Sequence, residues 1–97
     1  MELKLADSGT AFATRFRARR MLAELSYEPD VIDFKGVRSI SHSFADEFLG
    51  KILQRADDQG RSVRLVNLEG QASDSVEGML RYRGLDSVQR RLRRVAA

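Results

Sequence analysis

The chain has 97 residues, of which 42% are hydrophobic, 32% are charged and none is cysteine, and its formal net charge is +3. These totals favour a single globular domain over residues 1–97 and argue against general disorder. They also exclude disulfides and thiolate chemistry. No window approaches the roughly 18 consecutive apolar residues of a membrane span. Because the chain also starts without a basic-then-apolar leader, we expect a cytoplasmic protein.

Positive charge is concentrated in residues 81–97. This segment carries six arginines against one acid, Asp86, while the rest of the chain carries eleven bases and thirteen acids. A solubilising tail that also packs Leu92 and Val95 explains this pattern. The alternative is a nucleic-acid-binding segment, in which the phosphate contacts would be made by Arg81, Arg83, Arg90, Arg91, Arg93 and Arg94.

The first 26 residues predict a strand and then a helix. Leu3 and Leu5 alternate with polar neighbours over residues 1–5, and a turn with helix caps at Ser8 or Thr10 follows. From residue 11 to about residue 26, one helical face carries Phe12, Phe16, Ala18, Met21, Leu22 and Leu25. The arginines of this helix are expected on a solvated face, with an anion-binding face that includes Arg15 as the alternative.

The middle of the chain carries its clearest pattern. Pro29 ends the first helix, and residues 31–34 form an apolar run typical of a central strand. Asp33, near the end of this run, is expected to fix the following loop by hydrogen bonds to the loop backbone. A serine-rich turn over residues 39–43 then contains one apolar anchor, Ile40. The next helix, from Ser43 to about residue 58, carries Phe44, Ala45, Phe48, Leu49, Ile52, Leu53 and Ala56 on one face.

The start of this second helix has two candidate caps. Ser43 and Asp46 have the spacing of a capping box, and Ser41 competes as the cap. Acidic side chains at Asp46 and Glu47 also complement the positive end of the helix dipole. A buried strand that ends in a polar turn at a helix start is a common place for an α/β protein to present its chemistry.

The remaining elements repeat the alternation. Residues 62–68 predict a second interior strand, residues 70–75 a loop, and the following residues a third helix capped by Ser73 or Asp74 and closed by Gly84. Residues 86–95 fit either a helix or an edge strand. The order of elements predicts an α/β domain with a mixed, mostly parallel sheet of about four strands flanked by three to four helices.

Residues 31–53, VIDFKGVRSISHSFADEFLGKIL, resemble the strand–loop–helix core of STAS domains, the fold of sulphate transporter tails and anti-sigma factor antagonists. RSVRLVNL resembles the next strand of that fold, and VEGMLRYRGLDSV the next helix. The serine-rich turn followed by Phe-Ala-Asp-Glu is similar to the STAS-like family of unknown function, as is the Thr14-Arg15 pair. The resemblance covers roughly residues 10–90.

The resemblance implies a regulatory interaction module without cofactors. In antagonists of this class a kinase phosphorylates a serine at the helix start, and the matching residue here is Ser43. The implied partner is an ATP-binding kinase-like regulator, and a homodimer through the same face or the C-terminal segment is an alternative. The chain departs from the antagonist pattern at Ser41 and Phe44, where aspartate and glycine are usual. The expected partner-binding residues are Ser41, His42, Ser43, Asp46 and Glu47.

Enzymatic and metal-binding functions have little support in the sequence. His42 is the only histidine, and no third group that would orient its imidazole can be named. A metal site would need Asp33, His42, Asp46 and Glu47 to converge, but adjacent residues of a helix do not face each other. We therefore expect no catalytic residues, no bound metal and no cofactor.

Overall fold

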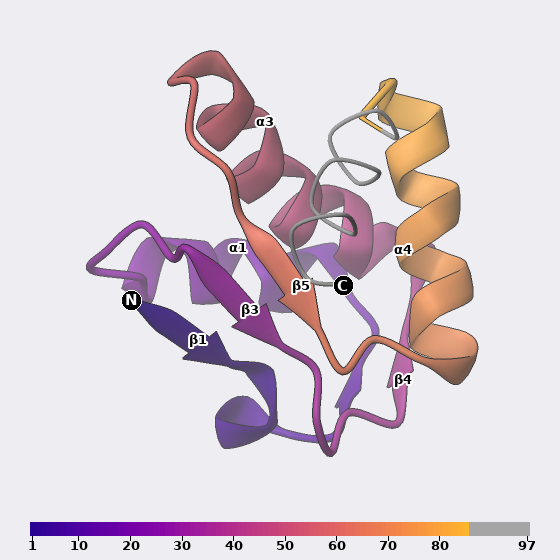
Figure 1. The fold of residues 1–97 in the computed structure, drawn as a ribbon. Coiled ribbons are helices and arrows are strands. Elements are labelled where there is room, and N and C mark those ends of the chain that lie inside the picture. The colour runs from indigo at the N-terminus through magenta and orange to yellow at the C-terminus, as the bar shows by residue number, and fades with distance from the viewer. Residues whose placement is uncertain (86–97) are drawn as a thin grey trace.

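The computed structural model describes residues 1–85, in which helices pack against a parallel sheet (Figure 1). The strands β1 (Glu2–Lys4), β3 (Val31–Asp33) and β5 (Arg64–Val66) pair in the order β1-β3-β5. Leu3, Ile32 and Leu65 share one register row, and Ile32 in the middle is fully buried. The sequence prediction of residues 31–34 as a central strand is confirmed.

A second sheet has two short parallel strands, β2 (Ala11–Phe12) and β4 (Ser39–Ile40). Phe12 and Ile40 pair in register, and both side chains are almost completely buried. The α/β class with mostly parallel strands is thus confirmed, with the strands divided into sheets of three and two. The prediction of a helix from residue 11 is wrong, because burying Phe12 beside Ile40 requires an extended backbone.

Helix α1 (Arg15–Glu24) begins where Thr14 caps it. The Thr14 hydroxyl accepts a hydrogen bond from the backbone N–H of Arg17, with 3.1 Å between the heavy atoms. The cap is therefore neither Ser8, at the end of the 3₁₀ turn Leu5–Ser8, nor Thr10. Phe16 follows the expected helical spacing from Phe12, but Phe12 lies outside the helix and Phe16 is 68% exposed, so the two do not share a buried helical face.

The second helical segment runs without a break from residue 42 to residue 58 but changes its pitch on the way. It consists of α2 (His42–Phe44), a π turn (Ala45–Leu49) and α3 (Gly50–Asp58). The cap is Ser41, whose hydroxyl accepts from the backbone N–H of Phe44 at 3.0 Å and donates to the Ala13 carbonyl at 2.7 Å. The predicted capping box at Ser43 is wrong, because the helix begins one residue before it.

Helix α4 (Gly70–Arg83) starts earlier than predicted and includes all of residues 70–75, so the prediction of a loop there is wrong. Neither Ser73 nor Asp74 caps it. Its first turn is held on β4 by Gln71, whose side-chain oxygen accepts from the backbone N–H of Ile40 at 2.8 Å. The Gln71 amide nitrogen donates back to the Ile40 carbonyl at 2.9 Å. Gly84 ends α4 in the left-handed conformation, as predicted.

Three phenylalanines join these elements in the core. The ring centroids of Phe12 and Phe44 are 4.9 Å apart, and those of Phe44 and Phe48 are 5.3 Å apart. All three side chains are at most 1% exposed, and burial of each contributes about 1.5–3 kcal/mol. The π turn thereby contacts α1 on one side and α4 on the other.

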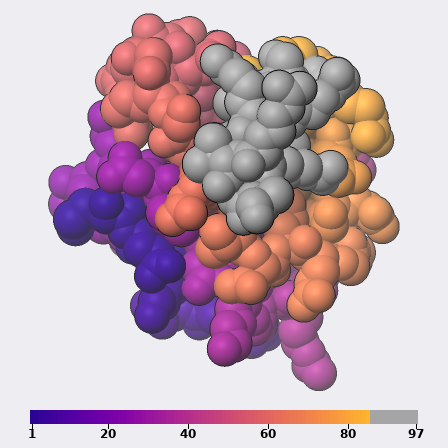
Figure 2. Space-filling view, viewed as in Figure 1, coloured from indigo at the N-terminus to yellow at the C-terminus, as the bar shows by residue number. Residues whose placement is uncertain are grey.

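The space-filling view shows β1 at one side of the visible face and α4 at the other (Figure 2). Residues 86–95, for which the sequence predicts either a helix or an edge strand, lie outside the described residues. Within the described part, no helix is both long enough and apolar enough to cross a lipid bilayer.

Candidate functional site

The two serines of the predicted turn have different roles. Ser41 uses its hydroxyl both to cap α2 and to bind the Ala13 carbonyl, so it joins the helix start to the end of β2. Ser43 is half-buried, and its hydroxyl forms no hydrogen bond with any residue among 1–85. Of the two hydroxyls, that of Ser43 is available for contact with another molecule.

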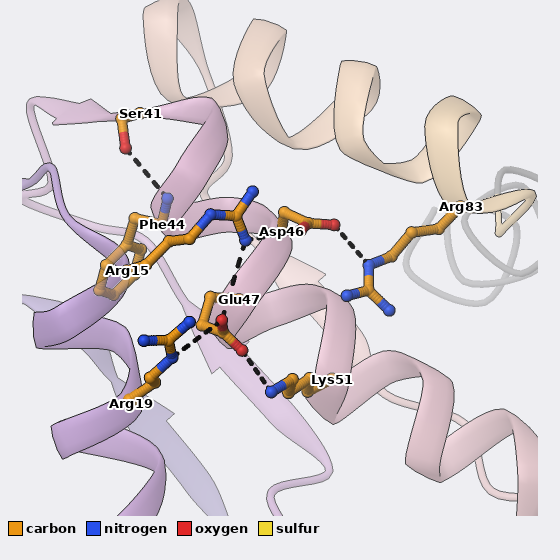
Figure 3. Close-up of polar contacts among 8 residues, drawn as sticks. All are labelled: Arg15, Arg19, Ser41, Phe44, Asp46, Glu47, Lys51 and Arg83. Carbon is orange, nitrogen blue, oxygen red and sulfur yellow. Dashed lines mark hydrogen bonds and ion pairs between the residues drawn. The ribbon is translucent and has the colours of Figure 1, made fainter.

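Asp46 lies in the π turn and joins α1 to α4 (Figure 3). Its two carboxylate oxygens accept hydrogen bonds from different helices, one from Arg15 Nη1 at 2.8 Å and one from Arg83 Nε at 2.7 Å. Both bonds lower the pKa of the Asp46 carboxyl, and the bond from Arg15 has the larger effect. The Asp46 carboxylate in turn raises the pKa of Arg15. Asp46 is therefore ionised and holds the two helices together.

Glu47 is the buried carboxylate of the site, with only 5% of its surface exposed. It forms ion pairs with Lys51, with Arg19 at 3.2 Å and with Arg15 at 3.8 Å (Figure 3). Lys51 is the main cause of the lowered pKa of Glu47, and Arg19 adds to it. Because burial alone would raise the pKa of a carboxyl, these cations are what keeps Glu47 charged.

The two carboxylates of the π turn share one cation and differ in the others. Asp46 and Glu47 both pair with Arg15 of α1. Asp46 also contacts Arg83 of α4, whereas Glu47 also contacts Arg19 and Lys51. Single π turns inside α-helices are frequent at functional sites. Residues 45–49 are therefore the part of the helical segment that departs from regular α-helical geometry.

Two helical glycines make room for this arrangement. A Cβ atom on Gly50 would lie 2.3 Å from Nε of Arg83, so the Arg83 side chain passes over Gly50 on its way to Asp46. A Cβ on Gly78 would lie 2.6 Å from Cε1 of His42, so the imidazole rests directly on the α4 backbone. A larger residue at Gly50 would displace the Arg83 side chain, and one at Gly78 would displace the His42 ring.

An open pocket of about 340 Å³ lies beside Ser43. One part of its wall comes from α4, through Gly78, Met79 and Tyr82. The rest comes from α1, α2 and the π turn, through Arg15, His42, Ser43 and Asp46. Tyr82 is 86% exposed, which makes it an unusually accessible aromatic side chain. The pocket therefore combines an apolar wall with a free hydroxyl and a charged pair.

The structure brings most of the predicted site residues together. His42, Ser43, Asp46 and Arg15 line the pocket, whereas Ser41 serves as the cap and Glu47 is buried beneath the charged network. Arg83 is bound to Asp46 and Arg81 is exposed. Arg90, Arg91, Arg93 and Arg94 lie outside the described residues. The partner-binding and anion-binding roles of all these residues stay predictions.

Other predicted roles can be compared with the structure. Asp33 accepts hydrogen bonds from the Lys35 backbone N–H at 2.9 Å and from the Asn67 side chain at 2.8 Å, which confirms that it fixes the loop. The two hydrogen bonds lower the pKa of Asp33, and the bond from Asn67 has the larger effect. Among residues 1–85, no group of three or more histidine and carboxylate side chains is placed to hold a metal ion.

Sequence reasoning missed the contribution of α4 and the cations around Glu47. Gly78, Met79 and Tyr82 were not among the predicted site residues. One available signal was an isolated glycine inside each of two helical patterns, Gly50 and Gly78, because such glycines usually have a packing or functional reason. Arg19 and Lys51 gave no such signal.

Residues 13–69, more than half of the chain, match the family model described as STAS-like domain of unknown function (DUF4325). This segment runs from the end of β2 to the residue before α4, so it contains the serine turn, the π turn and both carboxylates. Searches of the curated proteins and of the solved structures each found no significant match. With its parallel α/β architecture and this match, the chain belongs to the family of STAS-like domains of unknown function.

Proposed function

We propose that this domain is a non-enzymatic regulatory module that docks a protein partner at the start of α2. We call the contact region the Ser43 surface and define it as His42, Ser43, Arg15 and the exposed Tyr82. The observation that carries the proposal is the half-buried Ser43 hydroxyl, which lines an open pocket and has no hydrogen-bond partner in the described part of the chain. A serine hydroxyl both donates and accepts, so this one is free to form a hydrogen bond with an incoming molecule.

The proposed partner is an ATP-binding kinase-like regulator, as the likeness to anti-sigma factor antagonists implies. In this proposal Ser43 is also the phosphorylated residue. A phosphate adds nearly two negative charges next to the Asp46 carboxylate and competes for the Arg15 guanidinium. The unmodified hydroxyl is therefore the state that binds, and phosphorylation releases the partner by repulsion.

Support for a non-enzymatic function comes from the surroundings of His42. The imidazole is exposed, rests on Gly78 and forms no hydrogen bond with residues 1–85. A catalytic base needs a second group that fixes its orientation and tautomer. Ser41, the other serine beside it, is already committed as a helix cap.

The test is a binding measurement with full-length chains. Wild type, Ser43→Asp and the control Ser62→Asp are titrated against purified kinase-like regulators from the same cell. Ser62 is an exposed residue before β5, so its substitution adds the same charge far along the chain from the Ser43 surface. We expect Ser43→Asp to abolish binding and Ser62→Asp to leave it unchanged, because only the first places charge beside Asp46. Binding that survives Ser43→Asp contradicts the proposal.

The nucleic-acid alternative is tested in the same full-length background. A variant with serine in place of Arg90, Arg91, Arg93 and Arg94 removes four of the seventeen cations without shortening the chain. Steep loss of heparin or DNA retention in this variant, with no partner effect from Ser43→Asp, would favour a nucleic-acid-binding accessory protein. Of the other arginines in that hypothesis, Arg81 is exposed, whereas Arg83 is partly buried and pairs with Asp46.

A further inference from the structure

The charged network around the π turn contains more cations than anions. Its ion pairs join two carboxylates, Asp46 and Glu47, to four cations, which are Arg15, Arg19, Lys51 and Arg83. Among these residues two positive charges are left without a carboxylate of their own. A network with this excess attracts an anionic group from outside the chain.

Of the four cations in the network, Arg15 is the one that lines the pocket, whereas Arg19 and Lys51 are more exposed but lie outside it. The Arg15 side chain is 46% exposed. One N–H of its guanidinium binds Asp46, and no other hydrogen bond from this side chain is formed within residues 1–85. A guanidinium has five N–H donors, so Arg15 retains donors for a second carboxylate.

The α4 wall of the same pocket is apolar. Met79 is 2% exposed and forms part of the wall, Gly78 leaves space because it has no side chain, and the Tyr82 ring is 86% exposed. Exposed aromatic side chains beside a pocket are typical anchors of protein interfaces. The small part of Met79 that reaches the pocket belongs to a thioether side chain, which packs well against an aromatic ring.

We infer that the pocket binds a partner segment in which a carboxylate accompanies an aromatic side chain, with the carboxylate on Arg15 and Ser43 and the ring on Met79 and Tyr82. The inference specifies the partner chemistry of the proposed function and rests on it. A carboxylate suits the site better than a phosphate, because Asp46 also lines the pocket and would repel the second charge of a phosphate. An acidic partner group also explains how phosphorylation of Ser43 would expel the partner.

The experiment is an NMR titration of the isotope-labelled full-length chain with small probes. Phenylpropionate carries both features, phenylpropylamine replaces the carboxylate by a cation, and acetate has no ring. We expect phenylpropionate to shift the amide signals of Ser43, Gly78 and Tyr82 saturably, and each other probe to bind about tenfold more weakly or worse. Equal binding of the amine would overturn the acidic requirement, and equal binding of acetate would overturn the aromatic one.

Matched variants assign the two halves of the site. Arg15→Gln is compared with Arg20→Gln, because Arg20 lies on the same helix and does not line this pocket. Tyr82→Ala is compared with Phe16→Ala, which removes another exposed aromatic ring. We expect weakening of phenylpropionate binding of about tenfold from Arg15→Gln and a smaller loss from Tyr82→Ala, with neither control affected. Tyr82 is outside the charged network, so its substitution gives a result even if Arg15→Gln disturbs the fold.

These outcomes separate the pocket chemistry from the proposed function. If Ser43→Asp abolishes partner binding but phenylpropionate binds Arg15→Gln and Tyr82→Ala as tightly as wild type, the pocket chemistry is wrong and the proposed function stands. If phenylpropionate behaves as expected and no partner responds to Ser43→Asp, the pocket chemistry is supported and the proposed function is wrong.

Discussion

Replacement of Glu47 by glutamine removes the buried charge on which three cations converge. Glu47 is 5% exposed, and its carboxylate pairs with Lys51 and, at 3.2 Å, with Arg19. A hydrogen bond to a charged group contributes about 1.5–3 kcal/mol. Glutamine keeps one acceptor oxygen and turns an N–H₂ group toward a cation, so it loses one of the two bonds and weakens the other. Because Lys51 and Arg19 are at least half exposed and regain water, we expect a net loss of about 2 kcal/mol.

The assay is urea denaturation of wild type and Glu47→Gln at pH 7 and pH 3, followed by circular dichroism. The control is Glu24→Gln, which makes the same substitution in an exposed pair whose charged atoms are 3.9 Å apart. Such surface pairs contribute about 0.5 kcal/mol or less, so the control should change little. In melting temperature, the Glu47→Gln loss corresponds to about 10 °C for a domain of this size.

The pH dependence gives a second, independent check on this reasoning. The pKa of Glu47 is lowered in the folded state, so its stabilisation is fully present above the unfolded pKa of about 4.3 and is lost as the pH falls through the lower folded value. The difference between wild type and Glu47→Gln should therefore be smaller at pH 3 than at pH 7. A difference under about 0.5 kcal/mol at pH 7, or one that does not shrink at pH 3, would refute the role given to Glu47.

Two further substitutions test the local structure. Ser41→Ala should lower the free energy of unfolding by about 0.5–2 kcal/mol, because it removes the cap of α2. Ser43→Ala should lower it by less than about 0.5 kcal/mol. A larger loss from Ser43→Ala than from Ser41→Ala would show that Ser43 is the cap. Gly50→Ala should destabilise wild type because the new Cβ displaces Arg83 from Asp46. In an Arg83→Ala background the same change should instead stabilise by up to about 1 kcal/mol through helix propensity, and a loss of equal size in both backgrounds would contradict the close approach.

Local patterns in the sequence predicted the elements whose burial follows a simple period. The apolar run at residues 31–34 and the helical spacing from Phe44 to Ala56 both correspond to observed elements, and Gly84 ends α4 as expected. The spacing of Phe12 and Phe16 was misleading, because it fits a helix but arises from a buried strand residue and an exposed helical one. A two-residue strand is too short to leave a periodic signal of its own.

One part of the candidate site could be predicted, because the residues of that part are close in sequence. His42, Ser43 and Asp46 lie within one turn and its helix, so a local motif identified them. The π turn and the α4 wall depend on tertiary contacts, since Asp46 is held by arginines from two other helices. These contacts join residues that are far apart in the sequence, so no local pattern could predict them. Tyr82 likewise lines the pocket only because α4 packs against the π turn.

We propose that a protein partner binds at the Ser43 surface. Cross-saturation NMR of the isotope-labelled full-length chain, in complex with the kinase-like regulator that we propose as its partner, maps the contact directly. We expect the attenuated amide signals to cluster at His42, Ser43, Gly78 and Tyr82, which all line the pocket. A footprint confined to the edge strand β1 around Glu2, with these four signals unaffected, would contradict the proposal.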